Sequence, residues 1–152
     1  MHKKVLTAVL ALVLGAGFAL TALSQVKPDV LVEQRQAAMT LLGKYFGPLG
    51  GMVQGTVPYN ADVVARNAGY LEVLSKMPWD GFQASTANEK SRALPAVYAD
   101  AAKFKKAGDD MQAAVSKLVS VSKGGDEAAT KAATGAVGKT CGGCHDNFRQ
   151  RK

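Results

Sequence analysis

The sequence predicts an all-α protein folded as an antiparallel, up-down-up-down four-helix bundle. Apolar residues recur every three or four positions in four separate segments, and this spacing places them on one face of a helix. Short connections between these segments favour antiparallel neighbours. No segment alternates apolar and polar residues as a half-buried strand would, so no β-strand is expected.

Residues 1–24 are expected to be a signal peptide that precedes this fold. Two lysines are followed by an apolar run over residues 5–23, and small residues then place the cleavage site after Ser24. Because the run approaches the ~20 residues that span a bilayer, an uncleaved anchor is the alternative. Residues 25–152 are then one exported domain, and we expect it in the periplasm.

The first helix is expected to begin at Pro28 and Asp29, because proline suits the first helical turn and an acidic side chain favours the positive end of the helix dipole. A bend is expected at Gly47-Pro48, and the linker over residues 54–59 ends the helix. Its inward-facing residues are expected to be Leu31, Arg35, Ala38, Leu42, Tyr45, Leu49 and Met52.

The second helix follows Asn60, a favourable capping residue, and is expected to end near Pro78. After an irregular stretch over residues 80–94, Pro95 begins the third helix. The inward-facing residues of the second helix are expected to be Val63, Asn67, Tyr70, Leu74 and Met77, flanked by Val64 and Leu71. Those of the third are expected to be Val97, Ala101, Phe104, Gly108, Met111, Val115 and Leu118.

The fourth helix is expected to be capped by Asp126 and is poor in large apolar side chains. Small side chains leave cavities in a helical core unless a large group fills them. The alternative is that small residues let two helices approach closely. The inward stripe is expected to be Ala129, Ala133, Val137, Thr140 and Cys144.

This helix contains Cys141-Gly142-Gly143-Cys144-His145, the pattern of a covalent haem attachment site. Each thiol can form a thioether with a haem vinyl group, and the histidine can bind the iron. A zinc site would need four ligands, and a thioredoxin-type pair would follow a strand. We therefore expect one covalent haem c, with its iron, attached through Cys141 and Cys144 and bound axially by His145.

The opposite face of the iron has no histidine available, because the chain's other histidine, His2, lies in the predicted signal peptide. Arg35 occupies an inward position, where a buried charge needs a partner, and a haem propionate suits its guanidinium. Gln36 could bond the second carboxylate oxygen. Met39, one turn further along, could bind the iron or only cap it. The methionines available as a sixth ligand are Met39, Met52, Met77 and Met111.

Arg149 follows His145 by one helical turn, so it would lie near the proximal face of the haem or be exposed at a fraying terminus. The net charge is +7, and cleavage of the signal peptide would remove two lysines from it. The remaining basic residues are scattered, which indicates a solvated surface and no nucleic-acid module.

These features resemble the cytochrome c′ family. The resemblance rests on Arg35-Gln36-Ala37-Ala38-Met39 and on the C-terminal position of the haem motif, and it extends through residues 46–50, 55–59, 77–79, 94–98 and 140–149. It implies a five-coordinate, high-spin haem with His145 as axial ligand and Met39 crowding an empty sixth position. It also implies that Arg35 and Gln36 bind propionates and that Arg149 lies in the proximal pocket.

The resemblance further implies that a loop residue before the third helix approaches a propionate. Ser91 matches that position best, and Glu89 is the alternative. Members of the family bind nitric oxide and carbon monoxide, largely exclude dioxygen, and are commonly homodimers through the first two helices. Val32, Leu41 and Phe46 lie off the inner seam of the first helix and would suit that contact.

The expected function is therefore that of a periplasmic, non-enzymatic haem protein that binds these gases and can transfer electrons. The alternative is a low-spin electron carrier of the same fold, in which the sulfur of Met39 binds the iron. A peroxidase usually needs a distal acid–base pair, and the sequence offers none. The sequence does not indicate the redox partner, and no membrane association is expected after signal cleavage.

Overall fold

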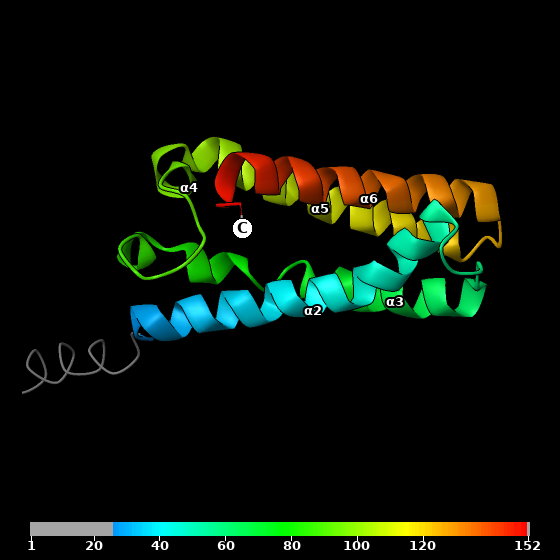
Figure 1. Cartoon of the computed structure of the whole chain (residues 1–152), viewed down its shortest axis with the longest axis horizontal. Helices are drawn as coiled ribbons and strands as arrows, with labels where there is room; N and C mark the ends of the chain where they lie inside the picture. Colours follow the sequence, from blue (N-terminus) through cyan, green and yellow to red (C-terminus); the bar gives the residue numbers. More distant parts are fainter. Residues whose placement is uncertain (1–25, 152) are drawn as a thin grey trace, which may run out of the picture.

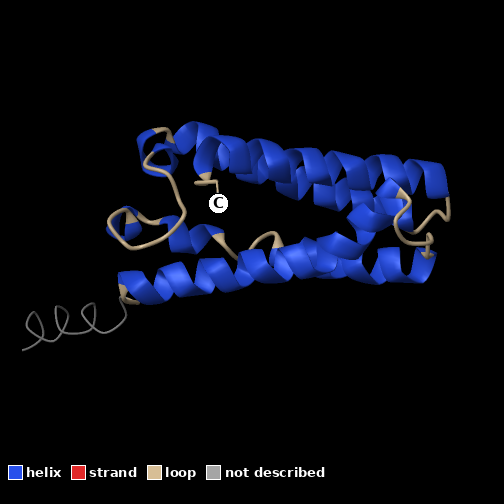
Figure 2. Ribbon diagram, viewed as in Figure 1, coloured by secondary structure: helices blue, strands red, loops and turns tan. Residues whose placement is uncertain are grey.

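The computed structural model describes residues 26–151, so the predicted signal peptide lies outside the described residues. The described part confirms the all-α class (Figures 1 and 2). Its four long helices are α2 (Pro28–Gln54), α3 (Ala61–Leu74), α5 (Ala101–Ser122) and α6 (Glu127–Phe148). The short elements are the 3-10 helices η1 (Trp79–Phe82) and η2 (Ala84–Thr86) and the single turn α4 (Ala96–Ala99).

The long helices form two layers, α2 with α3 and α5 with α6 (Figure 1). Contacts between α3 and α5 and between α2 and α6 join the layers into a closed four-helix bundle. An isolated bridge between Ala93 and Arg149 is the one β-type pairing within residues 26–151. None of the helices described is long and apolar enough to cross a membrane.

Helix α2 begins where the sequence predicts, with Pro28 in its first turn and Asp29 beside it. Pro48 lies inside the helix, and the last turns of α2 tilt toward α6 (Figure 1). The helix ends at Gly55, whose φ of 73° is the left-handed conformation that glycine adopts without strain.

The inner face of α3 differs from the prediction. The cap is as expected, because Asn60 Oδ1 accepts a hydrogen bond from Val63 N at 3.0 Å, but the helix ends at residue 74 rather than near residue 78. Tyr70 and Met77 are 45% and 53% exposed, whereas the residues buried in α3 are Val64, Asn67, Ala68, Leu71 and Leu74. The burial of Asn67 and Leu74 is as predicted, but the buried face is shifted from the predicted stripe toward its flanking residues Val64 and Leu71. The shift arises because α2 and α5, which both pack against α3, select its inner face.

The predicted third helix is interrupted at Asp100. Its backbone leaves helical geometry (φ −123°, ψ 60°), and its carboxylate accepts a hydrogen bond from Lys103 N, so that it caps α5 instead of continuing α4. Aspartate competes in this way because its side chain can bond nearby backbone groups. As a consequence, Ala101 is exposed rather than part of the inner seam.

The fourth helix starts at its predicted cap, since Asp126 Oδ1 accepts from Ala129 N at 3.0 Å. Its buried side chains are small, as expected, with Phe148 added near the C-terminus. Ala129 is exposed, and the hydroxyl-bearing residues Thr130 and Thr134 are buried in its place.

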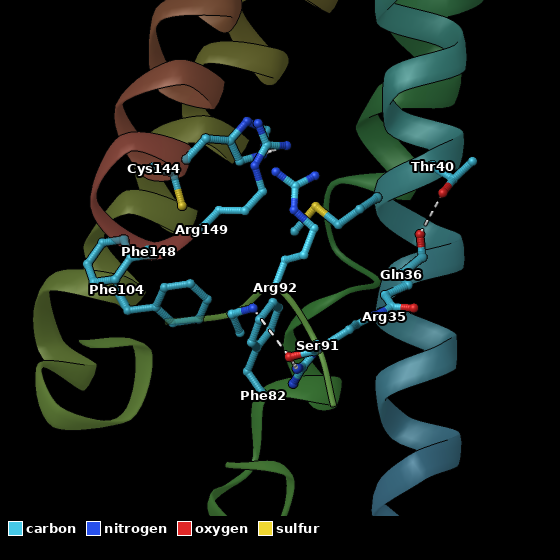
Figure 3. A pocket seen from close by; sticks show the side chains of 13 residues that line it. Arg35, Gln36, Thr40, Phe82, Ser91, Arg92, Phe104, Cys144, Phe148 and Arg149 are labelled. Carbon is cyan, nitrogen blue, oxygen red and sulfur yellow. Dashed lines mark hydrogen bonds between the residues drawn. The ribbon is translucent and has the colours of Figure 1, made fainter. Parts of the chain in front are cut away.

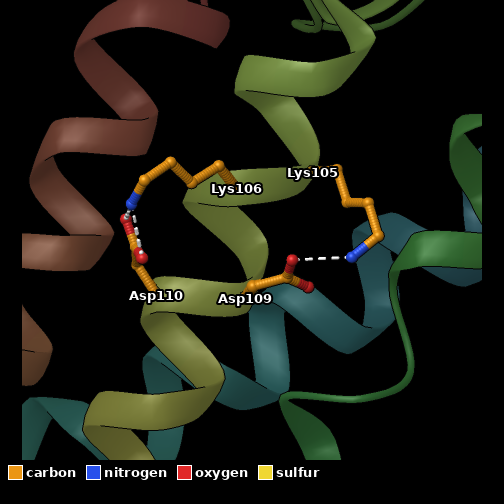
Figure 4. A network of polar contacts seen from close by, with 4 residues as sticks. All are labelled: Lys105, Lys106, Asp109 and Asp110. Carbon is orange, nitrogen blue, oxygen red and sulfur yellow. Dashed lines mark hydrogen bonds and ion pairs between the residues drawn. The ribbon is translucent and has the colours of Figure 1, made fainter.

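The outer face of α5 carries two ion pairs between residues four positions apart, Lys105 with Asp109 and Lys106 with Asp110, each at 2.6 Å (Figure 4). All four side chains are more than half exposed, so solvent screens both pairs. These lysines therefore belong to a solvated helix face, as predicted.

Candidate haem site

Two adjoining cavities lie between α2 and α6, near the C-terminal end of α6. The larger has a volume of about 390 Å³, and the smaller has a volume of about 220 Å³. Figure 3 shows the larger cavity, with side chains from α2 and α6 facing each other across it. Met39, Cys144, His145 and Arg149 line both cavities. Four of the residues predicted for the site are therefore brought together.

The predicted attachment residues share one face of α6. Residues three and four apart on a helix lie on the same side, so Cys141, Cys144 and His145 all reach the smaller cavity. Both cysteines are partly buried and form no disulfide. This arrangement presents two thiols and one imidazole to the same volume.

Burial sets the protonation of these groups. It raises the pKa values of the Cys141 and Cys144 thiols. The neighbouring Cys141 raises the pKa of Cys144 further. Burial lowers the pKa of His145, and the positive charges of Arg149 and Arg92 lower it further. The negative charge of Asp146 acts in the opposite direction but does not outweigh these effects, so the net shift favours the neutral form that a metal ligand requires.

Arg149 lies beside this imidazole, as predicted. Its Nη1 is 3.4 Å from His145 Nε2, and its side chain is exposed to solvent. A metal bound at Nε2 would displace the guanidinium, and the exposed position leaves it room to move.

Arg35 is the most informative residue of the larger cavity, because it is a charge that is only 3% exposed. Its Nη1 donates to the carbonyl oxygen of Gly81, to Thr86 Oγ1 at 3.0 Å and to Tyr98 Oη at 3.2 Å. Its Nη2 donates to Ser91 Oγ at 2.8 Å. All these acceptors are neutral.

No carboxylate among residues 26–151 pairs with Arg35. A buried charge without a counterion is costly, and an anionic group in the cavity that Arg35 lines would supply that counterion. A haem propionate has the required charge and suits a guanidinium. The residues present therefore fit the predicted cofactor.

The other residues predicted on this side have different environments. Gln36 lines the larger cavity from an exposed position on α2. Ser91 also lines it, whereas Glu89, the alternative, does not. Ser91 Oγ accepts a hydrogen bond from Arg35, and its predicted contact with a propionate stays a prediction.

Met39 is distinguished from the other methionines by its position. It is partly buried and lines both cavities together with His145, which lies on the facing helix. Met111 lines only the smaller cavity, Met52 lies in the packed core, and Met77 is on the surface.

Sequence reasoning missed Arg92. The loop that carries it is joined to the end of α6 by two backbone hydrogen bonds, Leu94 N to Phe148 O at 2.9 Å and Gln150 N to Arg92 O at 2.8 Å. Arg92 Nε also donates to Gln150 O at 3.1 Å. These contacts bring Arg92 to the larger cavity. Arg92 and Gln150 lie 58 positions apart, so no local sequence pattern predicts that they are in contact.

A cluster of aromatic rings was also missed as part of the wall. Phe104 stacks edge-on against Phe82 at 4.8 Å and against Phe148 at 5.2 Å between ring centroids. The Arg35 guanidinium lies 4.4 Å from the Phe82 centroid, so the cluster connects α2, η1, α5 and α6 around the larger cavity.

A four-helix bundle with this motif facing an interior cavity defines a c-type haem protein. The family model described as Cytochrome C' matches residues 30–149 of the chain. The chain belongs to the cytochrome c′ family, which confirms the family and the covalent haem c predicted from the sequence.

The relatives match nearly the whole bundle. Cytochrome c′ of Rubrivivax gelatinosus is 44% identical over 126 residues, which cover 82% of this chain and 98% of that protein. Its crystal structure covers 84% of this chain and 100% of its own, with a TM-score of 0.79. Two variants of cytochrome c prime from Alcaligenes xylosoxidans, one a nitric oxide complex and one with carbon monoxide bound, are 36% identical with TM-scores of 0.77 and 0.76. The matches cover 85% and 84% of this chain, respectively, and 100% of each variant's chain.

Proposed function

We propose that the chain is a periplasmic haem protein that binds nitric oxide and carbon monoxide at a five-coordinate, high-spin iron and can also transfer electrons. Cys141 and Cys144 would hold the haem through thioethers, and His145 would bind the iron axially. When bound, the haem supplies the iron at which a gas can bind. The remaining roles belong to side chains of this chain.

The observation that carries this proposal is the position of Met39. It lines the same cavities as His145 from the facing helix, and its neighbours in the smaller cavity on α2 and α3 are Leu42, Gly43, Phe46 and Leu71. Dioxygen on a haem depends on hydrogen-bond donors in the distal pocket, and the side chains of these four residues offer none. Crowding by Met39 together with an apolar wall therefore favours nitric oxide and carbon monoxide. Two related variants, one a nitric oxide complex and one with carbon monoxide bound, support the proposal for these two gases.

Arg35 would bind one haem propionate, with Ser91 holding its guanidinium in place. Gln36, which is free to move at the cavity edge, would bond a carboxylate oxygen. Arg149 would turn from His145 Nε2 and remain as a positive charge in the proximal pocket. In each case a side chain of the bundle orients the cofactor.

The same position of Met39 favours a second candidate function, a low-spin electron carrier in which its sulfur binds the iron. Two measurements separate the candidates: the ferric absorption spectrum, and carbon monoxide binding by the ferrous protein. A high-spin spectrum with carbon monoxide binding supports the gas-binding proposal. A sulfur–iron charge-transfer band without carbon monoxide binding would establish the alternative.

Met39→Leu sharpens this test, because leucine keeps the volume and removes the sulfur. The proposal expects the spin state to be the same in the variant and in the unmodified protein. A change from low to high spin would instead identify Met39 as the sixth ligand.

We also propose a homodimer through α2 and α3, with a revised contact face. Val32 is 5% exposed and Phe46 packs near Gly138 within the same chain, so neither is available as predicted, whereas Leu41 is 39% exposed. Tyr70 and Val73 add exposed apolar surface on α3. The mass in solution tests this: Val73→Glu should halve it, whereas a monomeric unmodified protein would contradict the dimer. Recovery of the mature protein by osmotic shock tests the periplasmic location.

A further inference from the structure

Gly43 is the one residue of α2 that is exposed to solvent and also lines the smaller, apolar cavity. The other α2 residues on this cavity, Met39, Leu42 and Phe46, are partly buried and carry large side chains. Gly43 is therefore the position on the α2 wall at which the residue has no side chain to lie between the cavity and solvent.

Neither packing nor backbone geometry explains a glycine here. A Cβ at Gly43 would meet no atom within 4 Å, whereas a Cβ at Gly108 would lie 2.8 Å from the ring of Trp79. Gly43 has no positive φ, unlike Gly55 and Gly125. Gly47 shares both properties but lines neither cavity, so its place on the cavity wall is what distinguishes Gly43. Glycine inside a helix destabilises it relative to alanine, and at Gly43 the missing side chain leaves that wall uncovered.

The neighbour of Gly43 on the helix surface is Met39, one turn earlier, since residues four apart lie side by side. Met39 lines the same cavity, and its unbranched side chain can change rotamer readily. A route that begins at Gly43 therefore leads past Met39 to the cavity that His145 lines.

We infer that the gap at Gly43 is the route by which small uncharged diatomic gases reach the cavity. The inference rests on the proposed function and adds to it the path and the residue that sets its width. The apolar lining disfavours hydrated ions, and the small opening disfavours larger ligands. Gly43 would thus control the rate of gas binding, while Met39 controls its strength.

The test compares Gly43→Leu with Gly47→Leu in the haem-loaded protein. Gly47 is the matched control, because it lies one turn further on α2, is exposed, has no atom within 4 Å of its Cβ position and lines neither cavity. Carbon monoxide rates on the ferrous protein are measured by stopped flow and by laser photolysis. Both variants should keep the helical circular dichroism and the ferrous absorption spectrum of the unmodified protein.

A side chain that narrows a route raises the barrier in both directions. Gly43→Leu should slow association and dissociation together, by about tenfold, and leave the dissociation constant unchanged. It should also increase the fraction of photolysed gas that rebinds before escaping. Gly47→Leu should change none of these values. Gly43→Ala should slow both rates by a smaller factor, and it provides the test if the leucine variant does not fold.

Three results would overturn the inference. The first is unchanged rates in both Gly43 variants, and the second is equal slowing in Gly43→Leu and Gly47→Leu. The third is a changed dissociation constant, with the association and dissociation rates of Gly43→Leu no longer falling by the same factor. The last would mean that the new side chain acts at the iron and not along the route. Failure of the unmodified protein to bind carbon monoxide would instead refute the proposed function, and any access route with it.

Discussion

The two ends of the bundle are held together in different ways. At the end where α2 connects to α3, aliphatic side chains fill the core, and Leu49, Val64 and Leu118, which line neither cavity, are each at most 2% exposed. At the end where α6 terminates, two cavities replace that core, and polar and aromatic contacts surround them. One end is complete in the polypeptide, whereas the other needs its cofactor.

The cavity end is held by the loop over residues 79–98. Arg35 binds this loop at Gly81, Thr86 and Ser91, and the bridge between Ala93 and Arg149 fastens it to α6. At Gly81 even a Cβ would come within 2.7 Å of the backbone oxygen of Leu31, so η1 packs directly on α2. The difference shows that burial of apolar side chains stabilises the packed end of the bundle. At the cavity end, hydrogen bonds hold the loop and leave Arg35 facing a space that an anionic group would fill.

The largest effect is expected from removing both attachment points, with Cys141→Ser and Cys144→Ser together. The variant should lose its covalent haem, because serine forms no thioether, and the unfilled cavities should weaken the cavity end. Mass spectrometry and amide hydrogen exchange check this. Protection should fall in residues 79–98 and persist around Leu118. A uniform loss of protection would show that the two ends are not separable.

The packed end is tested by Leu118→Ala, at a residue that is fully buried. Truncation leaves a cavity in an aliphatic core, so the free energy of unfolding should fall by about 2–5 kcal/mol. The haem spectrum and carbon monoxide affinity should not change. Denaturant titration gives the first quantity, and a shifted spectrum would argue against independent ends.

Arg35→Leu tests the cavity end by removing the buried charge. The reduction potential should shift, and the free energy of unfolding should fall by about 1–3 kcal/mol, because acceptors such as Thr86 and Ser91 lose their donor. Lys117→Leu, which removes an exposed positive charge from α5, is the control and should change neither. An unchanged potential in Arg35→Leu would count against propionate binding.

The smallest effect is expected outside both ends, at the exposed ion pair of Lys106 and Asp110 (Figure 4). Lys106→Ala should change the free energy of unfolding by less than about 0.5 kcal/mol, because solvent screens the pair. The effect should disappear at high salt. A loss comparable with that of Leu118→Ala would mean that the surface of α5 contributes far more than its exposure suggests.

Features that depend on neighbouring residues were predictable. Asn60 and Asp126 cap the helices expected of them, because a cap is a bond between residues two or three apart. The buried charge of Arg35 was predictable from its position in an apolar seam. Its neutral partners were not, because Gly81 and Tyr98 lie 46 and 63 positions away.

Expectations that required knowledge of packing were less accurate. The periodicity of α3 fits two adjacent faces, and contact with α2 and α5 selected the one that buries Leu71 and exposes Tyr70. Val32 was expected on the surface but is buried. Asp100 interrupts a helix whose apolar spacing continues through it, because its own cap competes with the helical hydrogen bond.

The sequence by itself determined the class of fold, the family and the covalent haem, because helix periodicity and a five-residue attachment motif are both local patterns. Only the tertiary structure decided what surrounds that haem: the neutral cradle of Arg35, the pairing that brings Arg92 to the cavity, and the place of Gly43 on the cavity wall. These contacts join segments that are far apart in the chain, and long-range packing carries no signature in the order of neighbouring residues.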